Sequence, residues 1–404
     1  MIAAAVDNCR ICEGEHLTPV LDLGILRVSS FPEGKPDPLH EAPLRLLACD
    51  TCATVQLAHT VPPEILFQGE YWYASGINGT MREELRHIVR SARQWVKIAD
   101  GDWVLDIGAN DGTLLSAWRE HLWEGKPNRM AVEPAGTFAK VLADTAEAVV
   151  TELFPTHALA GSARQFKAIT SVAMFDAVPT PVEFAQEVAR LLTPDGVWIV
   201  QMQDLQQMVE GVAVDNICHE HLIYYTPETL AVVCRRAGLK IVEVTKRTIN
   251  GGSLRFVIQH ETALAAEVLH TAWDDPINWD KFDWQISDRL VRLQDTVALA
   301  NNLGHVVDLL GASTKGNTLL QLAGLGPAQI RQAWERHPKK LGRTTITGIP
   351  IVSEAAGRAI PPNLLICPIW QFRDAVIERE REYLKREGRI YFPLPTGDLF
   401  QGEV

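Results

Sequence analysis

The sequence has no apolar run of about 18 residues, the length that a membrane-spanning helix requires. Its first residues, Met1-Ile-Ala-Ala-Ala-Val-Asp, do not form a signal-peptide pattern. We therefore expect a chain that stays in the cytoplasm and has no membrane partner.

A basic patch is also missing. The chain has 38 lysine and arginine residues against 50 aspartate and glutamate residues, a formal net charge of -12 at pH 7. Such a surface repels nucleic acid and anionic lipid, so neither is expected as a general partner.

Short-period repeats and low-complexity tracts are absent too. With 404 residues, of which 47% are hydrophobic, the chain is too long for one ordinary core, and we expect two large lobes and a smaller module.

Cysteine is scarce, yet four of the seven cysteines form two matched pairs, Cys9-Arg-Ile-Cys12 and Cys49-Asp-Thr-Cys52. Two such pairs can place four thiolates at the corners of a tetrahedron, which suits zinc; the alternative is a chance pairing of free thiols. A four-thiolate site leaves no open coordination position, so the zinc should be structural. The other cysteines are widely spaced and are expected in the core or a site rather than in disulfides: Cys218, Cys234 and Cys367.

After this module, short apolar runs alternate with segments of helical periodicity, which predicts βαβ units and a parallel sheet. The first series has predicted strands at 103–107, 130–132, 168–173 and 197–202, and predicted helices at 80–99, 114–121, 138–145 and 181–192. The second series has apolar runs at 306–310 and 364–367 and a charged helix at 374–387. We predict a second α/β lobe from it.

A glycine-rich turn, Gly108-Ala-Asn-Asp-Gly112, follows the first predicted strand of the first series. It lacks the G-x-G-x-x-G pattern of dinucleotide sites. Asp111 would repel two phosphates but would suit a sulfonium, and Glu133 at the next strand end could accept bonds from ribose hydroxyls. S-adenosylmethionine therefore fits better than NAD, although a turn without a ligand is the alternative. The predicted cofactor residues of this region are Asp106, Gly108, Asn110, Asp111, Gly112 and Glu133.

Several further motifs occur in a characteristic order. They are Tyr71-Trp-Tyr-Ala-Ser75, Val132-Glu-Pro134, Leu191-Leu-Thr-Pro-Asp-Gly196, His219-Glu-His221, Gly251-Gly-Ser-Leu-Arg255 and Phe392-Pro-Leu-Pro395. With the cysteine pairs and the two glycine turns, 108–112 and 311–317, the chain resembles the sugar C-methyltransferases of deoxysugar and antibiotic biosynthesis, which methylate C3 of nucleotide-linked 4-keto sugars.

The resemblance covers nearly the whole chain and implies an α/β fold in three parts. These are a zinc-binding module at 1–68, a class I methyltransferase domain with a Rossmann-like sheet at 69–245, and a second Rossmann-like domain at 246–404 that binds the nucleotide of the substrate. It also implies a nucleotide-sugar substrate, S-adenosylmethionine and structural zinc as cofactors, and a monomer or homodimer.

The implied reaction needs a base that removes the proton on C3 and donors that stabilise the enolate. By resemblance, His221 is expected to accept or relay the proton, and Glu220 to orient it or bind a sugar hydroxyl. Tyr71 and Tyr73 could contact the methyl donor or the keto oxygen; we assign Tyr71 to the cofactor and Tyr73 to catalysis. The alternative is that the histidine run with its neighbouring tyrosines forms a satisfied structural network.

Substrate binding is expected from Tyr224 and from the second lobe. Lys315 and Asn317 in the turn 311–317 suit a diphosphate or a nucleobase, and Arg255 is a further candidate for the diphosphate. The alternative for Lys315 is an exposed, solvated lysine.

Two departures from the family pattern concern the reaction itself. Cys218 stands where the family usually has tyrosine, and Ala177 stands where it often has histidine. The enzyme could deprotonate a different carbon with His221 alone, act on a substrate that needs less help, or catalyse another reaction. The alternatives to C-methylation are O- or N-methylation, a non-methylating step, or a catalytically dead binding module. Cys218 is expected to fill space rather than to act as a nucleophile.

Overall fold

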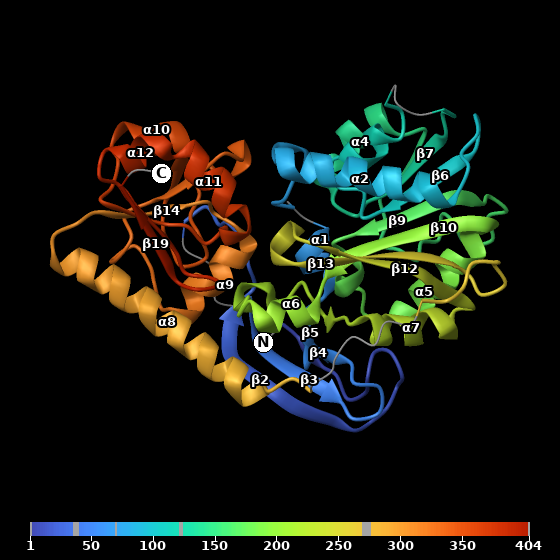
Figure 1. Ribbon diagram of the computed structural model, residues 1–404, viewed down its shortest axis with the longest axis horizontal. Coiled ribbons are helices and arrows are strands. Elements are labelled where there is room, and N and C mark those ends of the chain that lie inside the picture. The colour runs from blue at the N-terminus through green and yellow to red at the C-terminus, as the bar shows by residue number, and fades with distance from the viewer. Residues whose placement is uncertain (1, 35–39, 69–70, 121–123, 269–275, 403–404) are drawn as a thin grey trace.

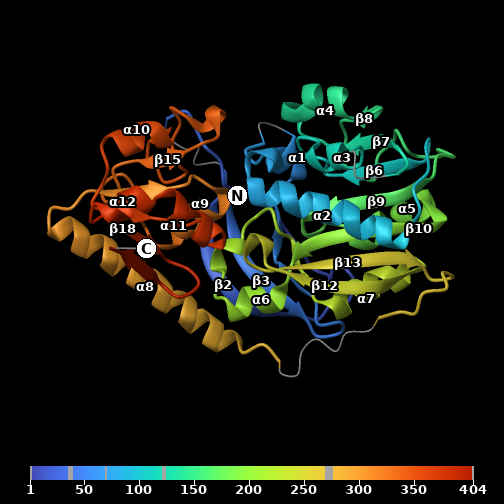
Figure 2. The ribbon, with the colours of Figure 1, turned by 45° about the horizontal axis from the view of Figure 1, so that its top comes forward.

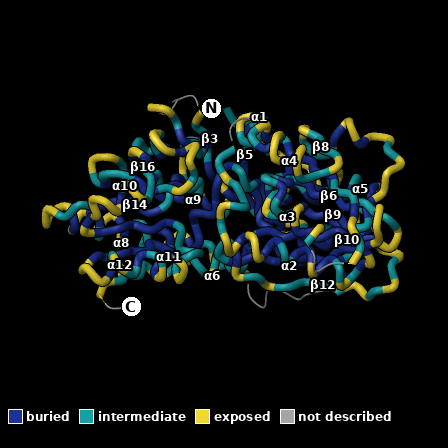
Figure 3. Tube along the Cα trace, turned by 90° about the horizontal axis from the view of Figure 1, so that it is seen from above, coloured by how far each residue is buried: buried dark blue, intermediate teal, exposed yellow. Residues whose placement is uncertain are grey.

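The computed structural model describes residues 2–34, 40–68, 71–120, 124–268 and 276–402. Figure 1 shows two lobes, each built on a sheet with helices, and an N-terminal sheet that runs below both. In Figure 3 buried segments run through both lobes. Among the helices of these described ranges, none is both long and apolar enough to cross a membrane.

The N-terminal module is an antiparallel sheet that borrows a strand from later in the chain. Its strand order is β11-β4-β3-β2. The bounds are β2 Leu17–Arg27, β3 Glu41–Cys49, β4 Val55–Leu57 and β11 Ile223–Tyr224, and the small pair β1 Ala4–Ala5 and β5 His59–Thr60 lies beside it. In β11, Ile223 pairs with Gln56 and Tyr224 with Val55, so the module is closed by residues that follow the histidine run.

The methyltransferase-like lobe contains a seven-stranded sheet in the order β12-β13-β10-β9-β6-β7-β8. The strands from β10 to β8 are parallel, and β13 is antiparallel to both of its neighbours. The bounds are β6 Trp103–Ile107, β7 Asn128–Val132, β8 Ala148–Val150, β9 Phe166–Val172, β10 Leu192–Gln203, β12 Leu239–Arg247 and β13 Ser253–His260. The sheet therefore extends beyond residue 245, where the sequence predicts this domain to end.

Helices cover both faces of this sheet, because its central strands are apolar on both sides. Helix α2 crosses one face in Figure 2 and buries residues of helical spacing such as Leu85, Ile88 and Ala92. Asn78 caps its N-terminus by accepting from the Thr80 amide. The helix bounds are α1 Pro63–Phe67, α2 Gly79–Trp95, α3 Thr113–Ala117, α4 Ala139–Thr145, α5 Pro181–Leu191, α6 Leu205–Glu210 and α7 Pro227–Arg236.

The C-terminal lobe contains a six-stranded sheet in the order β16-β15-β14-β17-β18-β19, parallel except for β19. Its strands are β14 Val307–Leu310, β15 Ala333–Glu335, β16 Ile351–Ser353, β17 Leu364–Ile366, β18 Arg389–Phe392 and β19 Asp398–Gln401. Its helices are α8 Trp279–Asn302, α9 Thr314–Leu322, α10 Glu354–Ala359, α11 Arg373–Arg379 and α12 Arg381–Lys385. The predicted α/β fold with an N-terminal module and a second α/β lobe is confirmed.

The predicted charged helix at 374–387 is divided into α11 and α12 at Glu380. This carboxylate is 2% exposed and accepts from Arg358 and Arg379. These ion pairs link the junction of the two short helices to α10. The segment is therefore more than the solvated face that its alternating charges indicate.

Candidate active site and metal centre

The two cysteine pairs fold into matching turns. After the first pair, the Cys9 amide donates to Gly14 O and the Glu13 amide donates to Cys9 O. After the second pair, the Cys49 amide donates to Thr54 O and the Ala53 amide donates to Cys49 O. Glu13 and Ala53 both have positive φ, 65° and 59°, so each pair is followed by one left-handed residue.

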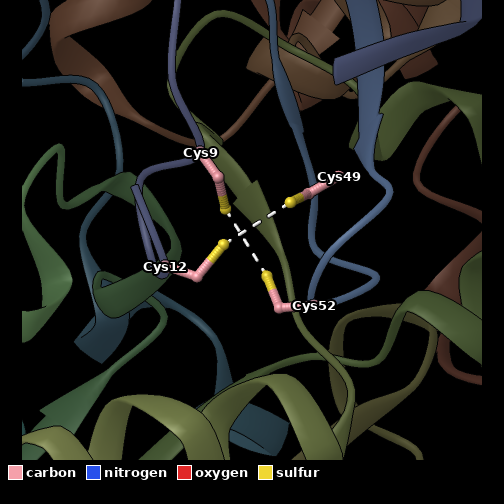
Figure 4. A group of neighbouring side chains, drawn as sticks. All are labelled: Cys9, Cys12, Cys49 and Cys52. Atoms are coloured by element: carbon pink, nitrogen blue, oxygen red, sulfur yellow. Dashed lines mark hydrogen bonds between the residues drawn. The ribbon is translucent and has the colours of Figure 1, made fainter. Parts of the chain in front are cut away.

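These turns bring the four sulfurs together, as Figure 4 shows. All four lie within 4.8 Å of one another, and Cys9 Sγ to Cys52 Sγ and Cys12 Sγ to Cys49 Sγ are each 3.5 Å apart. A tetrahedral zinc with bonds of about 2.3 Å requires sulfurs about 3.8 Å apart, so the site fits Zn²⁺. Four thiolates fill the coordination shell, which makes this a structural zinc site, as predicted.

A cavity of about 330 Å³ lies at the carboxyl ends of the parallel strands, the usual ligand site of such sheets. Ten of the residues predicted for binding or catalysis line it: Tyr71, Tyr73, Asp106, Gly108, Asn110, Asp111, Glu133, Glu220, His221 and Lys315. Four others do not: Gly112, Tyr224, Arg255 and Asn317.

One half of the cavity is formed by the glycine turn and the ends of β6 and β7. Gly108 has a φ of 75°, and a Cβ there would lie 2.9 Å from Met174 Cγ, so any other residue would be strained and would displace Met174. Glu133 accepts from the amides of Asn110 at 2.7 Å and Ala135 at 2.8 Å. These bonds fix its carboxylate at the cavity wall, where it retains lone pairs for ribose hydroxyls. The arrangement fits the adenosyl part of S-adenosylmethionine.

Asp106 lines this half of the cavity, and its ionised carboxylate can only accept hydrogen bonds. Its Oδ1 accepts from Thr170 Oγ1 at 2.6 Å. Burial raises the pKa of Asp106 to about 7, and the charges of Glu133 and Asp111 add to the increase. Burial also raises the pKa of Glu133. A cationic cofactor would favour the charged forms of these carboxylates.

Asn110 and Asp111 have an additional role that the sequence did not indicate. Asn110 Oδ1 accepts from the Ser75 amide at 2.9 Å, and its Nδ2 donates to Tyr73 O at 2.9 Å. Asp111 Oδ2 accepts from the Gly76 amide at 2.7 Å. The cofactor turn therefore holds the segment 73–76 in place, and this segment brings Tyr73 to the cavity wall.

The other half of the cavity contains His221, Glu220 and a residue that sequence reasoning missed, Asp176. His221 Nδ1 lies 2.8 Å from Asn216 O, and its Nε2 lies 3.8 Å from Asp176 Oδ2. Burial lowers the pKa of His221, but Cys218 and Asp176 raise it by more, to about 10. Burial raises the pKa of Glu220. Asp176 directly precedes Ala177, which is one of the two departures from the family pattern. This position was the signal in the sequence that could have identified it.

Lys315 lies where the two lobes meet. Its Nζ donates to Asn216 Oδ1 and, at 3.3 Å, to Asn250 O. Nearby, Trp370 Nε1 donates to Asp215 Oδ2 at 3.0 Å across the same boundary. The lysine is therefore an ordered cation at the cavity edge rather than a solvated surface residue.

Two predicted substrate ligands are corrected by the structure. Arg255, 1% exposed, donates to Glu84 Oε1 at 2.7 Å and to Gln201 Oε1 at 2.8 Å, so its charge is neutralised under helix α2. Asn317 Nδ2 donates to Ser29 Oγ and Ser30 O, each at 3.0 Å, and joins the C-terminal lobe to the N-terminal module. Neither side chain is available to a diphosphate.

Two other predicted residues do not line the cavity. Tyr224 is 3% exposed and lies in β11, against the N-terminal sheet. Gly112 precedes α3 with a φ of 76°, and a Cβ there would lie 2.9 Å from Thr145 Cγ2. Gly112 therefore allows close packing of the turn rather than direct contact with a ligand.

Three models of known protein families match consecutive parts of the chain. Residues 9–67 match "Putative zinc binding domain", residues 77–244 match "Methyltransferase domain", and residues 248–395 match "C-methyltransferase C-terminal domain". The chain is 27% identical over 426 aligned positions to C-methyltransferase NovU of Streptomyces niveus, covering 100% of this chain and 99% of that one.

Two solved structures are similar to somewhat less than half of the chain. N-methyltransferase NodS from Bradyrhizobium japonicum is 11% identical and covers 45% of this chain and 97% of its own, with a TM-score of 0.35. Cyclopropane synthase MmaA2 from Mycobacterium tuberculosis is 13% identical and covers 48% of this chain and 92% of its own, with a TM-score of 0.36. At these scores the likenesses support no conclusion about this chain.

The cofactor cavity and the three consecutive family matches define a methyltransferase that carries a structural zinc module. The order of the three matches along the chain agrees with the resemblance that its motifs indicate. The C-terminal family model and the full-length relative are both named for C-methylation.

Proposed function

We propose that this C-methyltransferase acts on a nucleotide-linked keto-deoxysugar and methylates the carbon next to the ketone, C3 beside a C4 ketone, through an enolate. The observation that supports this most directly is the pairing of two halves in one cavity. Glu133 and Gly108 line the cofactor half, and His221 and Glu220 line the other. Ionisable side chains therefore line the same cavity as the proposed site of the methyl donor.

When bound, the cofactor supplies an electrophilic methyl group on a positive sulfonium. The residues of the chain have to activate the acceptor carbon and to exclude water. In this proposal His221, Glu220 and Asp176 supply the ionisable groups for proton transfer, and Tyr73 donates a hydrogen bond to an oxygen of the substrate. Lys315 at the lobe boundary suits a phosphate of the nucleotide, which would extend toward the C-terminal lobe.

The test is methyl transfer to a thymidine diphosphate-linked 4-keto-6-deoxyhexose. Purified protein is incubated with S-adenosylmethionine labelled with ¹³C in the methyl group, and the product is examined by NMR. The expected result is a methyl carbon bonded to carbon. A methyl bonded to oxygen or nitrogen, or no transfer to any nucleotide-linked keto sugar, would contradict the proposal.

His221→Asn tests the proton-transfer half separately. It should reduce methyl transfer by about 100-fold while leaving cofactor binding unchanged, because the imidazole is expected to contact the reacting substrate rather than the cofactor. The matched control is His157→Asn, since His157 is exposed and does not line the cavity. Unchanged activity of His221→Asn would return the histidine run to a structural role.

A further inference from the structure

Asp176 is a buried carboxylate that is only partly accounted for by the fold. It belongs to the short turn Phe175–Ala177 after β9, is 5% exposed and lines the cavity. Its backbone carbonyl accepts from the Leu222 amide at 2.8 Å, which holds the segment that carries His221. Its side-chain Oδ1 has no hydrogen-bond partner within the described part of the chain. A buried oxygen without a partner is costly, and such atoms occur where a ligand is to be bound.

The geometry of His221 shows what its two nitrogens can do. The Asn216 carbonyl, 2.8 Å from Nδ1, only accepts hydrogen bonds, so Nδ1 carries a proton. Nε2 lies 3.8 Å from the Asp176 carboxylate, an approach that favours a proton on Nε2 as well. With both nitrogens protonated, His221 can donate a hydrogen bond but cannot accept a proton.

Other charged or ionisable groups around His221 are Cys218, Glu220, Lys315 and Asp215. Lys315 is cationic and disfavours the imidazolium, whereas Glu220 favours it. Glu220 also borders a second cavity of about 200 Å³, which it shares with Tyr71 and Ser29 of the N-terminal part. Glu220 therefore lines both cavities. Asp176 lines only the larger of these two, together with Met174 and Ala177.

We propose that Asp176 is a catalytic residue that accepts the proton from the acidic carbon of the substrate, and that His221 donates from Nε2 to the oxygen of the resulting enolate. The inference rests on the proposed function. The carbon–hydrogen bond breaks, the proton passes to a carboxylate oxygen of Asp176, and the electron pair moves through the carbonyl group onto its oxygen. This assignment replaces the acceptor role that the sequence predicts for His221.

The experiment measures exchange of the acidic sugar proton into D₂O, by NMR, with the same 4-keto-6-deoxyhexose nucleotide and S-adenosylhomocysteine in place of the methyl donor. Exchange reports proton removal without methyl transfer. Asp176→Asn should lower it by about 100-fold or more, with zinc content and cofactor affinity unchanged. Asp176→Ala should regain part of its exchange with added formate, which supplies the missing carboxylate.

Asp204→Asn is the matched control. Asp204 follows β10 as Asp176 follows β9, is 2% exposed and accepts from the Gln206 amide, but does not line the cavity. It should keep exchange within a few-fold of the unmodified protein. If Asp176→Asn loses zinc or cofactor, Asp176→Glu decides, because it keeps a carboxylate and should exchange at least about tenfold faster than the asparagine variant.

The outcomes separate the two proposals. If the unmodified protein exchanges the proton and Asp176→Asn does so at a similar rate, or formate leaves Asp176→Ala unchanged, the assignment of Asp176 is overturned while the proposed function stands. If the unmodified protein neither exchanges the proton nor methylates a nucleotide-linked keto sugar, the proposed function fails, and the assignment fails with it.

Discussion

Replacing Glu133 by glutamine should weaken binding of S-adenosylmethionine without unfolding the protein. Glu133 ends β7, is 6% exposed and is held by the amides of Asn110 and Ala135 at 2.7 and 2.8 Å. Glutamine has the same shape but only one acceptor oxygen, so one of these amides would face an NH₂ group. It also loses the charge that strengthens bonds to ribose hydroxyls.

The magnitude follows from two hydrogen bonds. Two bonds from ribose hydroxyls to an ionised acceptor, each contributing roughly 1 to 1.5 kcal/mol, give a loss of about 2 kcal/mol, or about a 30-fold higher Kd. The assay is isothermal titration calorimetry at pH 7.5. Asp195→Asn is the control, since Asp195 pairs with Lys167 and does not line the cavity. An unchanged Kd for Glu133→Gln in a folded protein would refute the cofactor assignment.

Three further predictions test other parts of the structure. Cys49→Ser should release zinc, measured by elemental analysis, and lower the thermal stability of the whole chain; a zinc-free native protein would contradict this. The pKa of Asp106 rises from its ordinary 3.8 to about 7 on folding, so the folded apo-protein binds the extra proton. Its contribution to the free energy of unfolding should therefore be greatest below pH 4 and fall as the pH rises to about 7. Chemical denaturation should show that Asp106→Asn flattens this dependence, and equal slopes would disprove the raised pKa. Asn110→Ala should weaken cofactor binding by only a few-fold but make the segment 73–76 more sensitive to proteolysis, and equal cleavage of both proteins would count against its link to Ser75 and Tyr73.

Features set by short stretches of sequence could be predicted. The cysteine pairs depend on spacing, and the turn 108–112 depends on strand-to-helix geometry. The structure brings the four cysteines together and has residues of the turn at the cavity, as expected. Asp176 was missed because its meaning depends on His221, which lies 45 residues later and reaches it only after the chain has passed through β10.

Two of the predicted substrate ligands, Arg255 and Asn317, are wrong for the opposite reason. Arg255 and Asn317 are polar residues beside glycine turns, which in sequence resemble ligand contacts. Their partners, Glu84 and the serines at 29 and 30, come from distant segments that only tertiary packing brings near. A sequence pattern shows that a charge or an amide is present, but not that another part of the chain already satisfies it.

The shared strand β11 affects how the enzyme can be dissected. Leu222 donates from its amide to Asp176 O and accepts at its carbonyl from the Leu57 amide, so one residue ties the turn that carries Asp176 to the zinc module. His221 is its immediate neighbour. A shortened chain that begins after the module would leave the segment around residues 218–225 without the strand it pairs with, and a module expressed alone would lack its edge strand. The two pieces are therefore an interlocked unit that recombination or truncation cannot separate cleanly, and metal loss at the cysteines should disturb proton transfer at the far side of the sheet.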